Sequence, residues 1–543
     1  MTQEGTTLLP ERSPLVGERE LLTSDRDVPD LVTIVGGGIS GALVAVQLAR
    51  IAARPTRIEV IEPRASLGEG LAYSATDPAH RINVPAARMT VFADDPEHFE
   101  RWLLRAGAMQ DDAAARWQDG CLYPQRRLFG AYVAELVADA LRANPHVTIR
   151  HRRDRVTRID AVGTGFTLHL QHAEPVPLLA DLVVLAVTHP PPAMPAPLLA
   201  ARAAGAPIIA DPWQAGALDK VAADADVLII GTGLTMADVV ATLERRGHRG
   251  RVTAISRRGL LSRGHAAGQV AKRDWFATAA PPRTALALCR AVRDQVRRAA
   301  AEGVPWQAVL DDARANGTRL WTALPQAEQR RLVRHLRPYW DVHRFRVAPQ
   351  VEAAIGRMRA DGRFTSLPAS LLGADWDGTH CVVRLRPRGA PPGGEIVCRA
   401  DGVVVTTGPA HGSALATNPA LASLAAQGLL RPDPAGLGVD VDGASRVLGR
   451  DGTARANLLV AGPLARGRFG ELMGLPQVAF HADDVARAAA AYLAARAPAA
   501  ADAAAPKGAV GSAAAPRGAA GNAAAQHDAA AFPPRHSAVF PAQ

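Results

Sequence analysis

The chain has 543 residues, 48% of them hydrophobic and 21% charged, with a formal net charge of +10 at pH 7. This length exceeds what a single hydrophobic core usually supports, so two or three domains are expected. Only three of the 62 basic residues are lysines, and the arginines are scattered rather than grouped, which argues against a dedicated nucleic-acid surface.

The cysteines and the apolar segments narrow the class of protein further. Cys121, Cys289, Cys381 and Cys398 are far apart in sequence, so neither a disulfide framework nor a metal site is expected. Charged residues precede the first apolar run, unlike a signal peptide, and no uninterrupted stretch of about 18 apolar residues occurs. We therefore expect a soluble, cytoplasmic protein without a membrane partner.

The two ends of the chain have compositions typical of disorder. Residues 1–29 are polar and aperiodic, and residues 496–543 consist largely of Ala, Pro and Gly. The second of these segments contains two copies of one decamer, at 503–512 and 513–522. Neither segment holds enough large apolar side chains to offset the entropy of ordering, so both are predicted to be disordered.

Between these ends, one pattern occurs twice. An apolar strand, a glycine turn and a helix are predicted at 31–50 and again at 226–246. Each copy is followed later by a hairpin-like stretch and a short apolar strand, at 180–187 and at 400–408. Continuous apolar runs of this length suit parallel strands buried on both faces. The repeated pattern predicts an α/β fold with two doubly wound (Rossmann-like) dinucleotide-binding domains.

The positions of the two copies predict how the chain is divided. The first domain is expected at 30–205, the second at 206–399, and a return to the first domain at 400–495. A helical insertion containing two amphipathic stretches is expected within the second domain at about 281–359.

The first glycine turn has the spacing of a dinucleotide-binding motif. Gly36 allows the tight turn, Gly38 lets a pyrophosphate approach the backbone, and Gly41 lets the helix pack closely on the strand. The next strand ends in Glu62, where a carboxylate can accept hydrogen bonds from ribose hydroxyls. The candidate residues for this nucleotide are Gly36, Gly38, Ile39, Ser40, Gly41 and Glu62.

The second glycine turn differs from the first in two ways. Met236 stands where the third glycine would be, and no acid ends the following strand. Instead, Arg257 and Arg258 follow Ser256, which suits the 2′-phosphate of NADPH rather than NADH. In a chain this rich in arginine, a chance pair of arginines is the alternative. The candidate residues for the second nucleotide are Gly231, Gly233, Leu234, Thr235, Ser256, Arg257 and Arg258.

Five segments together resemble one family. Residues 36–92, 231–238, 256–260, 340–344 and 407–409 resemble the bacterial FAD/NAD(P)-binding oxidoreductase family, which is similar to FAD-dependent urate hydroxylase and flavin-dependent N-hydroxylating monooxygenases. The resemblance implies that the first turn holds FAD and the second holds NADPH or NADH. It also adds candidate FAD residues, namely Pro63, Arg64, Gly462 and Pro463.

The resemblance also implies a reaction. The chain would hydroxylate a small polar nitrogen-containing substrate, urate or an amino acid or other amine, with O2 and a flavin C4a-hydroperoxide. Two alternatives stay open: a flavin reductase or oxidase without oxygen insertion, and a non-enzymatic nucleotide-binding redox sensor. The absence of a cysteine pair shortly after the first turn excludes a disulfide reductase. A homo-oligomer is allowed but not required.

Three residues are candidates for a catalytic role. The resemblance suggests that Asn83 and Met89 lie at the edge of the flavin, whereas a turn asparagine and a core methionine are the plain alternatives. Glu471 is expected to orient the substrate, or else to be a carboxylate at a helix start. A further cluster predicts either a substrate clamp or structural ion pairs, and it comprises Trp340, Asp341, His343, Arg344 and Arg346.

Overall fold

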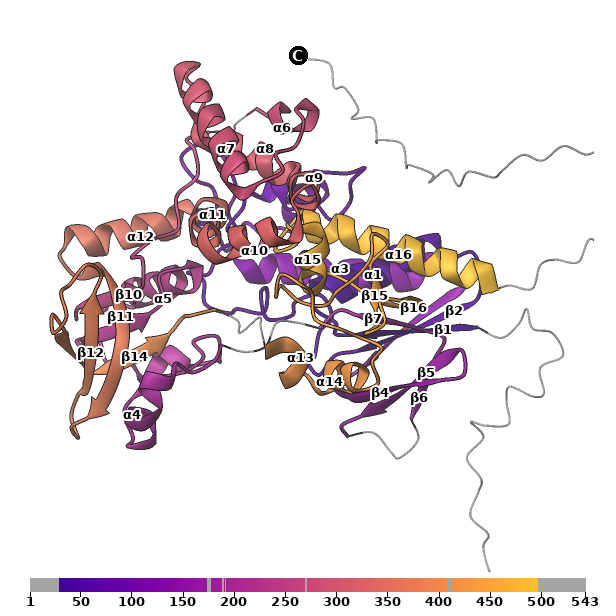
Figure 1. Cartoon of the computed structure of the whole chain (residues 1–543), viewed down its shortest axis with the longest axis horizontal. Coiled ribbons are helices and arrows are strands. Elements are labelled where there is room, and N and C mark those ends of the chain that lie inside the picture. The colour runs from indigo at the N-terminus through magenta and orange to yellow at the C-terminus, as the bar shows by residue number, and fades with distance from the viewer. Residues whose placement is uncertain are drawn as a thin grey trace, which may run out of the picture. The chain divides into compact units, whose positions relative to one another are not determined.

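Two mostly parallel sheets organise the chain in the computed structural model (Figure 1). The structure describes residues 29–172, 177–187, 190, 192–268, 271–408 and 413–496. Most of the predicted disordered leader and tail, including both decamers, lies outside the described residues.

The first sheet has six strands in the order β15-β16-β7-β1-β2-β3. Their bounds are β1 Asp30–Val35, β2 Thr56–Ile61, β3 Val147–Arg152, β7 Leu182–Leu185, β15 Arg446–Leu448 and β16 Ala454–Val460. All neighbours are parallel except β15 and β16. Every residue of β7 is buried, as expected of an apolar strand covered on both faces.

Helices cover one face of this sheet, and a small three-stranded sheet covers the other face (Figure 1). On the first face, α1 (Ile39–Ile51) packs against α3 (Arg126–Ala143) and α16 (Gln477–Arg496), and their apolar side chains share one core. On the other face lie an antiparallel three-stranded sheet and two short helices. Their bounds are β4 Val156–Val162, β5 Gly165–Leu170, β6 Leu178–Ala180, α13 Ala414–Thr417 and α14 Pro419–Ala426.

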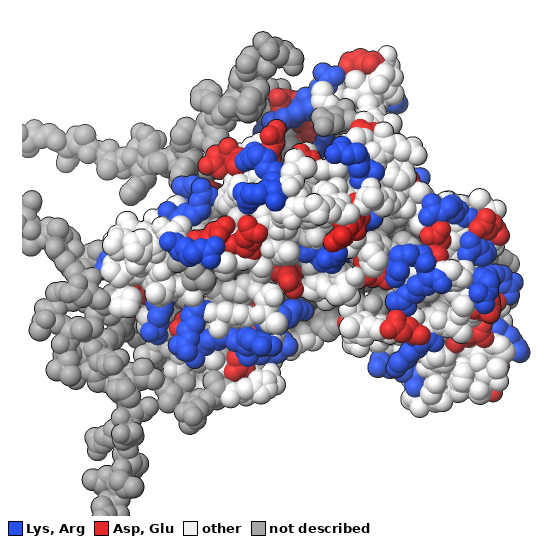
Figure 2. All heavy atoms as spheres, turned by 180° about the vertical axis from the view of Figure 1, so that it is seen from behind, with Lys and Arg blue, Asp and Glu red and all other residues white. Residues whose placement is uncertain are grey.

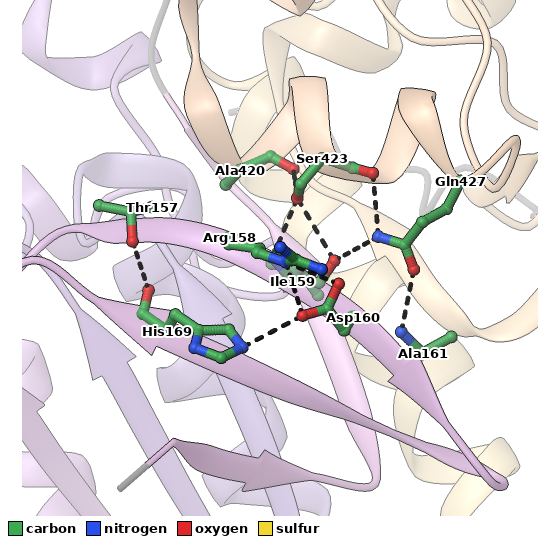
Figure 3. Close-up of polar contacts among 9 residues, drawn as sticks. All are labelled: Thr157, Arg158, Ile159, Asp160, Ala161, His169, Ala420, Ser423 and Gln427. Atoms are coloured by element: carbon green, nitrogen blue, oxygen red, sulfur yellow. Dashed lines mark hydrogen bonds and ion pairs between the residues drawn. The ribbon is translucent and has the colours of Figure 1, made fainter. Parts of the chain in front are cut away.

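Polar side chains along α14 satisfy the free edge of β4 (Figure 3). The backbone N–H of Ile159 donates to Ser423 Oγ at 2.9 Å, and that of Ala161 donates to Gln427 Oε1 at 3.2 Å. The Gln427 amide in turn donates to the Ile159 carbonyl at 2.7 Å. These contacts replace the strand that would otherwise pair there, so the edge is covered.

The second sheet has seven strands in the order β13-β12-β11-β10-β9-β14-β8. Their bounds are β8 Ile208–Ile209, β9 Val227–Ile230, β10 Val252–Ser256, β11 Phe364–Trp376, β12 Cys381–Pro387, β13 Ile396–Ala400 and β14 Gly402–Val405. The long strand β11 pairs parallel to β10 in its first part and antiparallel to β12 in its second. Helices α5 (Leu234–Arg245) and α12 (Pro349–Ala360) pack against each other beside this sheet.

The last strand of the second copy corrects one predicted boundary. β14 pairs parallel with β9 and β8, so it belongs to the second sheet. The chain therefore returns to the first sheet only after Val405, and the boundary at residue 400 was placed too early. The buried apolar run of β14 resembles that of β7, because each strand lies inside its own sheet with a neighbour on each side.

A group of helices precedes β11, as predicted for the helical insertion. Their bounds are α6 Trp275–Thr278, α7 Ala285–Ala301, α8 Trp306–Ala315, α9 Gly317–Thr322, α10 Gln326–His335 and α11 Arg337–Arg344, followed by α12. Thr284 begins α7 by accepting a hydrogen bond from the N–H of Ala287 at 3.1 Å. The two predicted amphipathic stretches correspond to α7 and α10, and no residue of α10 is buried.

Shorter elements complete the described chain. Their bounds are η1 Ala86–Arg88, α2 His98–Arg105, η2 Ala113–Ala115, η3 Ala196–Leu198, α4 Leu199–Ala203, η4 Ala217–Lys220, η6 Pro463–Ala465 and α15 Arg466–Phe469. On the face drawn in Figure 2, basic and acidic side chains are interspersed. None of the helices within the described ranges has both the length and the apolar character needed to cross a membrane.

Candidate functional site

The first glycine turn is closely packed on its strand and helix. Gly36 has φ +101°, and a Cβ there would lie 2.5 Å from the carbonyl oxygen of Ala186, just beyond β7. A Cβ on Gly41 would lie 1.9 Å from the carbonyl oxygen of Gly36. Side chains are excluded at both positions, so α1 starts close to the end of β1. A Cβ on Gly38 would meet only Gly70, at 3.6 Å, which leaves this part of the turn open.

Glu62 is held directly beside this turn. Its carboxylate is buried and accepts the backbone N–H groups of Gly37 and Arg64, each at 3.0 Å. The Arg64 guanidinium donates to the same carboxylate at 3.1 Å. Because β1 and β2 pair in parallel, the end of β2 brings this acid to the end of β1. The position suits a ribose next to the turn, and the contact with FAD stays a prediction.

Gly462, predicted for FAD from the far end of the sequence, lies against the same turn. Its φ is +80°, and a Cβ there would lie 2.2 Å from Ser40 Oγ at the start of α1. The Gly462 N–H donates to Nδ1 of His481 at 3.1 Å, and the other ring nitrogen lies 2.8 Å from Ser445 Oγ. Burial lowers the pKa of His481 to about 4, so the ring is neutral and Nδ1 can accept. Sequence reasoning did not identify His481, which lies within a helix of unremarkable pattern.

The topology explains why these distant residues meet. In the first sheet, β2 lies on one side of β1, whereas β7 and β16 lie on the other side. The direction of the chain's connections therefore reverses between β1 and β7. Ligands of doubly wound sheets bind at the carboxyl ends of the strands at such a point. The glycine turn after β1, Glu62 after β2 and Gly462 after β16 all lie at this edge.

The second glycine turn repeats this arrangement with more room. Gly231 has φ +124°, and a Cβ there would lie 2.5 Å from the carbonyl oxygen of Thr406, after β14. A Cβ on Gly233 would have no neighbour within 4 Å, so space is open beside the start of α5. Met236 occupies the place of the third glycine and is buried in the core of the second sheet. Leu234 and Thr235 form the first turn of α5.

The three residues predicted to bind a 2′-phosphate have different surroundings. Ser256 already accepts the N–H of Gly259 at 3.0 Å. The Arg258 guanidinium lies 5.5 Å from the ring centre of Tyr339 in α11. Arg257 is exposed and, within the described residues, makes no ion pair. Arg257 therefore has the guanidinium that is free to meet a phosphate.

The predicted residues of the flavin edge lie in a loop tied to other parts of the chain. Met89 is 3% exposed and packs in the core of the first sheet, as the alternative interpretation expected. The carbonyl of Asn83 accepts a hydrogen bond from Nε2 of His265 at 3.0 Å. Burial, and then the charge of Arg346, lowers the pKa of His265 to about 4, so this ring is neutral as well.

Glu471 is neither exposed nor at a helix start. It lies between α15 and α16, is 8% exposed, and accepts a hydrogen bond from Arg344 Nε at 2.6 Å. Arg314 Nε lies 3.5 Å from the same carboxylate. Burial raises the pKa of Glu471, but Arg344 and Arg314 outweigh burial and lower it overall. The acid is therefore a buried anion that joins its segment to α8 and α11. Sequence spacing gave no signal for Arg314.

The remaining members of the predicted cluster divide between ion pairs and a cavity wall. Arg346 pairs with Asp311 of α8 at 2.8 Å, and Asp311 also binds Arg88 at 2.7 Å. The ion-pair interpretation therefore holds for Arg344 and Arg346. Trp340, Asp341 and His343 line a cavity, and Asp341 also pairs with Arg337.

This cavity, called here the chamber, has a volume of about 1160 Å³. Helices α7 to α11 form most of its wall, and residues of the segment 466–473 close it on one side. Most lining side chains are apolar, and Glu471 is one of two acids among them. The chamber is thus bordered by the same segment that contacts the first glycine turn at Gly462.

The comparisons with known proteins agree with this geometry. Residues 33–190 match a family model described as FAD-NAD(P)-binding. No curated protein matches the chain. Among solved structures, the reduced ornithine hydroxylase from Pseudomonas aeruginosa is similar with a TM-score of 0.57 and 16% identity, covering 86% of this chain and 100% of that one.

Two further structures are similar to the same degree. The ornithine N-hydroxylase of Kutzneria sp. 744, determined with reduced FAD, NADP+ and L-ornithine, has a TM-score of 0.57 at 17% identity and covers 85% of this chain and 99% of that one. The L-lysine 6-monooxygenase from Pseudomonas syringae has a TM-score of 0.57 at 16% identity, with coverage of 86% and 100%.

These findings define the class of protein. The chain has the fold of enzymes with two dinucleotide-binding domains, and its residues 33–190 form an FAD/NAD(P)-binding segment. The predicted fold class and the predicted FAD/NAD(P) character of the first domain are thereby confirmed.

Proposed function

We propose that the chain is an FAD-dependent, NADPH-using monooxygenase that hydroxylates the nitrogen of an amine. The observation that carries this proposal is the double contact of the segment 462–473. Gly462 contacts Ser40 at the first glycine turn, while residues from Arg466 to Met473 form a wall of the chamber. One segment therefore borders both the proposed FAD site and a cavity large enough for a substrate.

The residues around the first turn fit FAD. Glycines keep the turn free of side chains, the start of α1 presents backbone N–H groups, and Glu62 lies where ribose hydroxyls can donate. Gly462 and Pro463 would cover the cofactor from β16. When bound, FAD would supply the redox chemistry that amino-acid side chains lack.

The second turn supports NADPH over NADH through Arg257. This exposed guanidinium follows β10, where the adenine ribose of a dinucleotide lies in a doubly wound domain. A phosphate on that ribose would pair with a planar fork of N–H donors, whereas a bare hydroxyl would not. No carboxylate follows β10 to receive the hydroxyl of NADH instead.

The comparisons support an amine rather than urate as the substrate. The similar solved structures are named for hydroxylation of ornithine and lysine, both of which carry amines. An amine also provides the lone pair that attacks oxygen.

The side chains of this chain would mainly position the reactants and keep water away. Apolar residues of α7 and α10 line the chamber, and the buried pair of Glu471 and Arg344 ties the segment 466–473 to α11. Exclusion of water protects a reactive oxygen species from decay. Glu471 is therefore a positioning residue, since its charge is already neutralised by arginines.

The test is a balanced reaction. An amine, O2, NADPH and a proton should give a hydroxylamine, water and NADP+. Purified FAD-loaded protein should oxidise NADPH faster when an accepted amine is present, and the product should contain ¹⁸O when ¹⁸O2 is supplied.

The same experiment separates the alternatives. NADPH oxidation that yields only hydrogen peroxide with every amine tested would favour a flavin reductase or oxidase. Protein that takes up no FAD and oxidises no NADPH would favour a nucleotide-binding sensor. Labelled product from urate, but from no amine, would show that the proposed substrate class is wrong.

A further inference from the structure

The chamber contains a buried arginine that makes no direct ion pair within the described residues. Arg466 is 4% exposed and lines the chamber four residues after Gly462. Its Nε donates to the carbonyl of Leu437 at 3.2 Å, and its Nη1 lies 3.0 Å from the sulfur of Met473. Its Nη2 is buried and has no hydrogen-bond partner within the described residues. A buried guanidinium that no acid contacts directly is costly, so a ligand that supplies an anion would be stabilised.

The charges around Arg466 point the same way. Burial, and then the neighbouring Arg337, lowers the pKa of Arg466 to about 10, and this lowering prevails over the opposite effect of Asp341, Glu471 and Asp433. Arg466 is still charged at neutral pH. Of the two acids in the wall, Asp341 is bound by Arg337 at 3.3 Å, and Glu471 is neutralised by Arg344 and Arg314. The five arginines that line the chamber outnumber its two acids, so the wall carries an excess of positive charge.

The rest of the chamber requires an apolar ligand. Leu288, Val292 and Val296 lie at intervals of four residues along α7 and line the cavity. Leu332 and Leu336 face it from the α10 side. These side chains are only half-buried, because the apolar stripes of the two helices meet a cavity rather than a packed core.

The volume leaves room for more than a small substrate. At about 1160 Å³, the chamber is at the upper end of ligand pockets, which are commonly about 300–1,000 Å³. An amino acid with a short or cationic side chain would leave the apolar wall in contact with water. A cationic side chain would also meet the surplus of arginines.

We propose that the chamber binds an amine that carries a carboxylate and a long apolar body. The carboxylate pairs with the Arg466 guanidinium, the amine lies beside it near the segment 462–473, and the apolar body extends between α7 and α10. This inference rests on the proposed monooxygenase function, and it distinguishes the ligand from ornithine and lysine, for which the similar structures are named.

The test uses FAD-loaded full-length protein and four probes in titration calorimetry. The probes are 2-aminodecanoate, decanoate without the amine, decylamine without the carboxylate, and alanine without the apolar body. We expect 2-aminodecanoate and decanoate to bind, decylamine to bind at least about tenfold more weakly, and alanine to show no binding. Equal binding of decanoate and decylamine, or binding of alanine alone, would overturn the proposal.

Two pairs of variants locate the ligand. Arg466→Met should abolish the preference for decanoate over decylamine, while Arg468→Met in the same short helix, whose side chain is exposed, should keep it. Leu288→Trp should block the chamber and weaken both probes at least about tenfold, while Leu286→Trp, 57% exposed on the same helix, should not. Because Leu288→Trp does not alter the buried arginine, the test survives if Arg466→Met fails to fold. Unchanged binding in Leu288→Trp would overturn the proposal.

The outcomes also separate this inference from the proposed function. Binding of 2-aminodecanoate without any ¹⁸O-labelled product would refute the monooxygenase and support the ligand class of the chamber. Hydroxylation of short amines with no binding of decanoate would refute the ligand class alone. A dimer that Leu288→Trp dissociates, with no decanoate bound, would assign the apolar wall to a second copy of the chain and overturn the proposal.

Discussion

Replacing Gly41 with alanine should remove FAD from the protein, whereas replacing a glycine that has open space around it should not. A Cβ at this position would lie 1.9 Å from the carbonyl oxygen of Gly36, and ordinary contact begins at 3.4 Å. The start of α1 must therefore move about 1.5 Å from the end of β1. Overpacking of this kind costs roughly 1–3 kcal/mol or more, and the gain in helix propensity offsets at most about 1 kcal/mol.

The displacement is larger than a hydrogen bond tolerates, because donors and acceptors stay within a range of about 0.5 Å. Loss of one or two charge-assisted bonds to the pyrophosphate would weaken FAD binding by about a hundredfold or more. The ratio of flavin to protein absorbance after purification and the affinity of the apoprotein for added FAD measure this effect.

The control is Gly356→Ala in α12. Gly356 is exposed, and its Cβ would meet no atom within 4 Å, so this change should slightly stabilise the helix and leave FAD bound. If Gly41→Ala kept a full complement of FAD and the melting temperature of the parent, the close packing of α1 on β1 would not be what positions the cofactor.

Three further predictions follow from single side chains. Arg257→Ala should raise the KM for NADPH about tenfold or more and leave that for NADH unchanged, and an equal loss for both would refute a 2′-phosphate contact. Burial lowers the pKa of His481 to about 4. The free energy of unfolding should therefore fall as the pH drops below about 6.5, because the unfolded chain then binds a proton that the folded chain does not. The loss should approach about 3 kcal/mol near pH 4 in denaturant titrations. His481→Gln should flatten the dependence of stability on pH, whereas His146→Gln, at an exposed site, should not. An unchanged pH dependence in His481→Gln would contradict this. Glu471→Gln should destabilise the protein by about 3 kcal/mol, because it leaves the buried Arg344 unpaired. Adding Arg344→Gln should recover part of this loss. Strictly additive losses would show that the pair is not coupled.

The sequence alone was sufficient to predict the two dinucleotide-binding domains. Strand, turn and helix are local patterns, and the packing demands at Gly36 and Gly41 follow from the spacing of the motif. The same holds for Glu62, since the end of the second strand of a parallel unit always lies beside the first turn. These features could be predicted because neighbours in the sequence create them.

Only the tertiary structure decided which distant residues complete the site. The contact of Gly462 with Ser40, and of His481 with Gly462, depends on β16 pairing beside β7, which no local pattern encodes. The boundary near residue 400 was misplaced for the same reason, because a short apolar strand such as β14 can close either sheet.

The chamber and its charges lay furthest beyond the reach of the sequence. The amphipathic helices α7 and α10 were visible as patterns, yet the pattern could not show that their apolar faces border a cavity instead of a core. Among 59 arginines, nothing local distinguishes Arg466 from its exposed neighbour Arg468. Burial distinguishes them, and burial is a property of how separate segments pack together. The sequence determined which cofactors the chain is built to hold, and the packing of the insertion against the segment 462–473 determined which charges face a substrate.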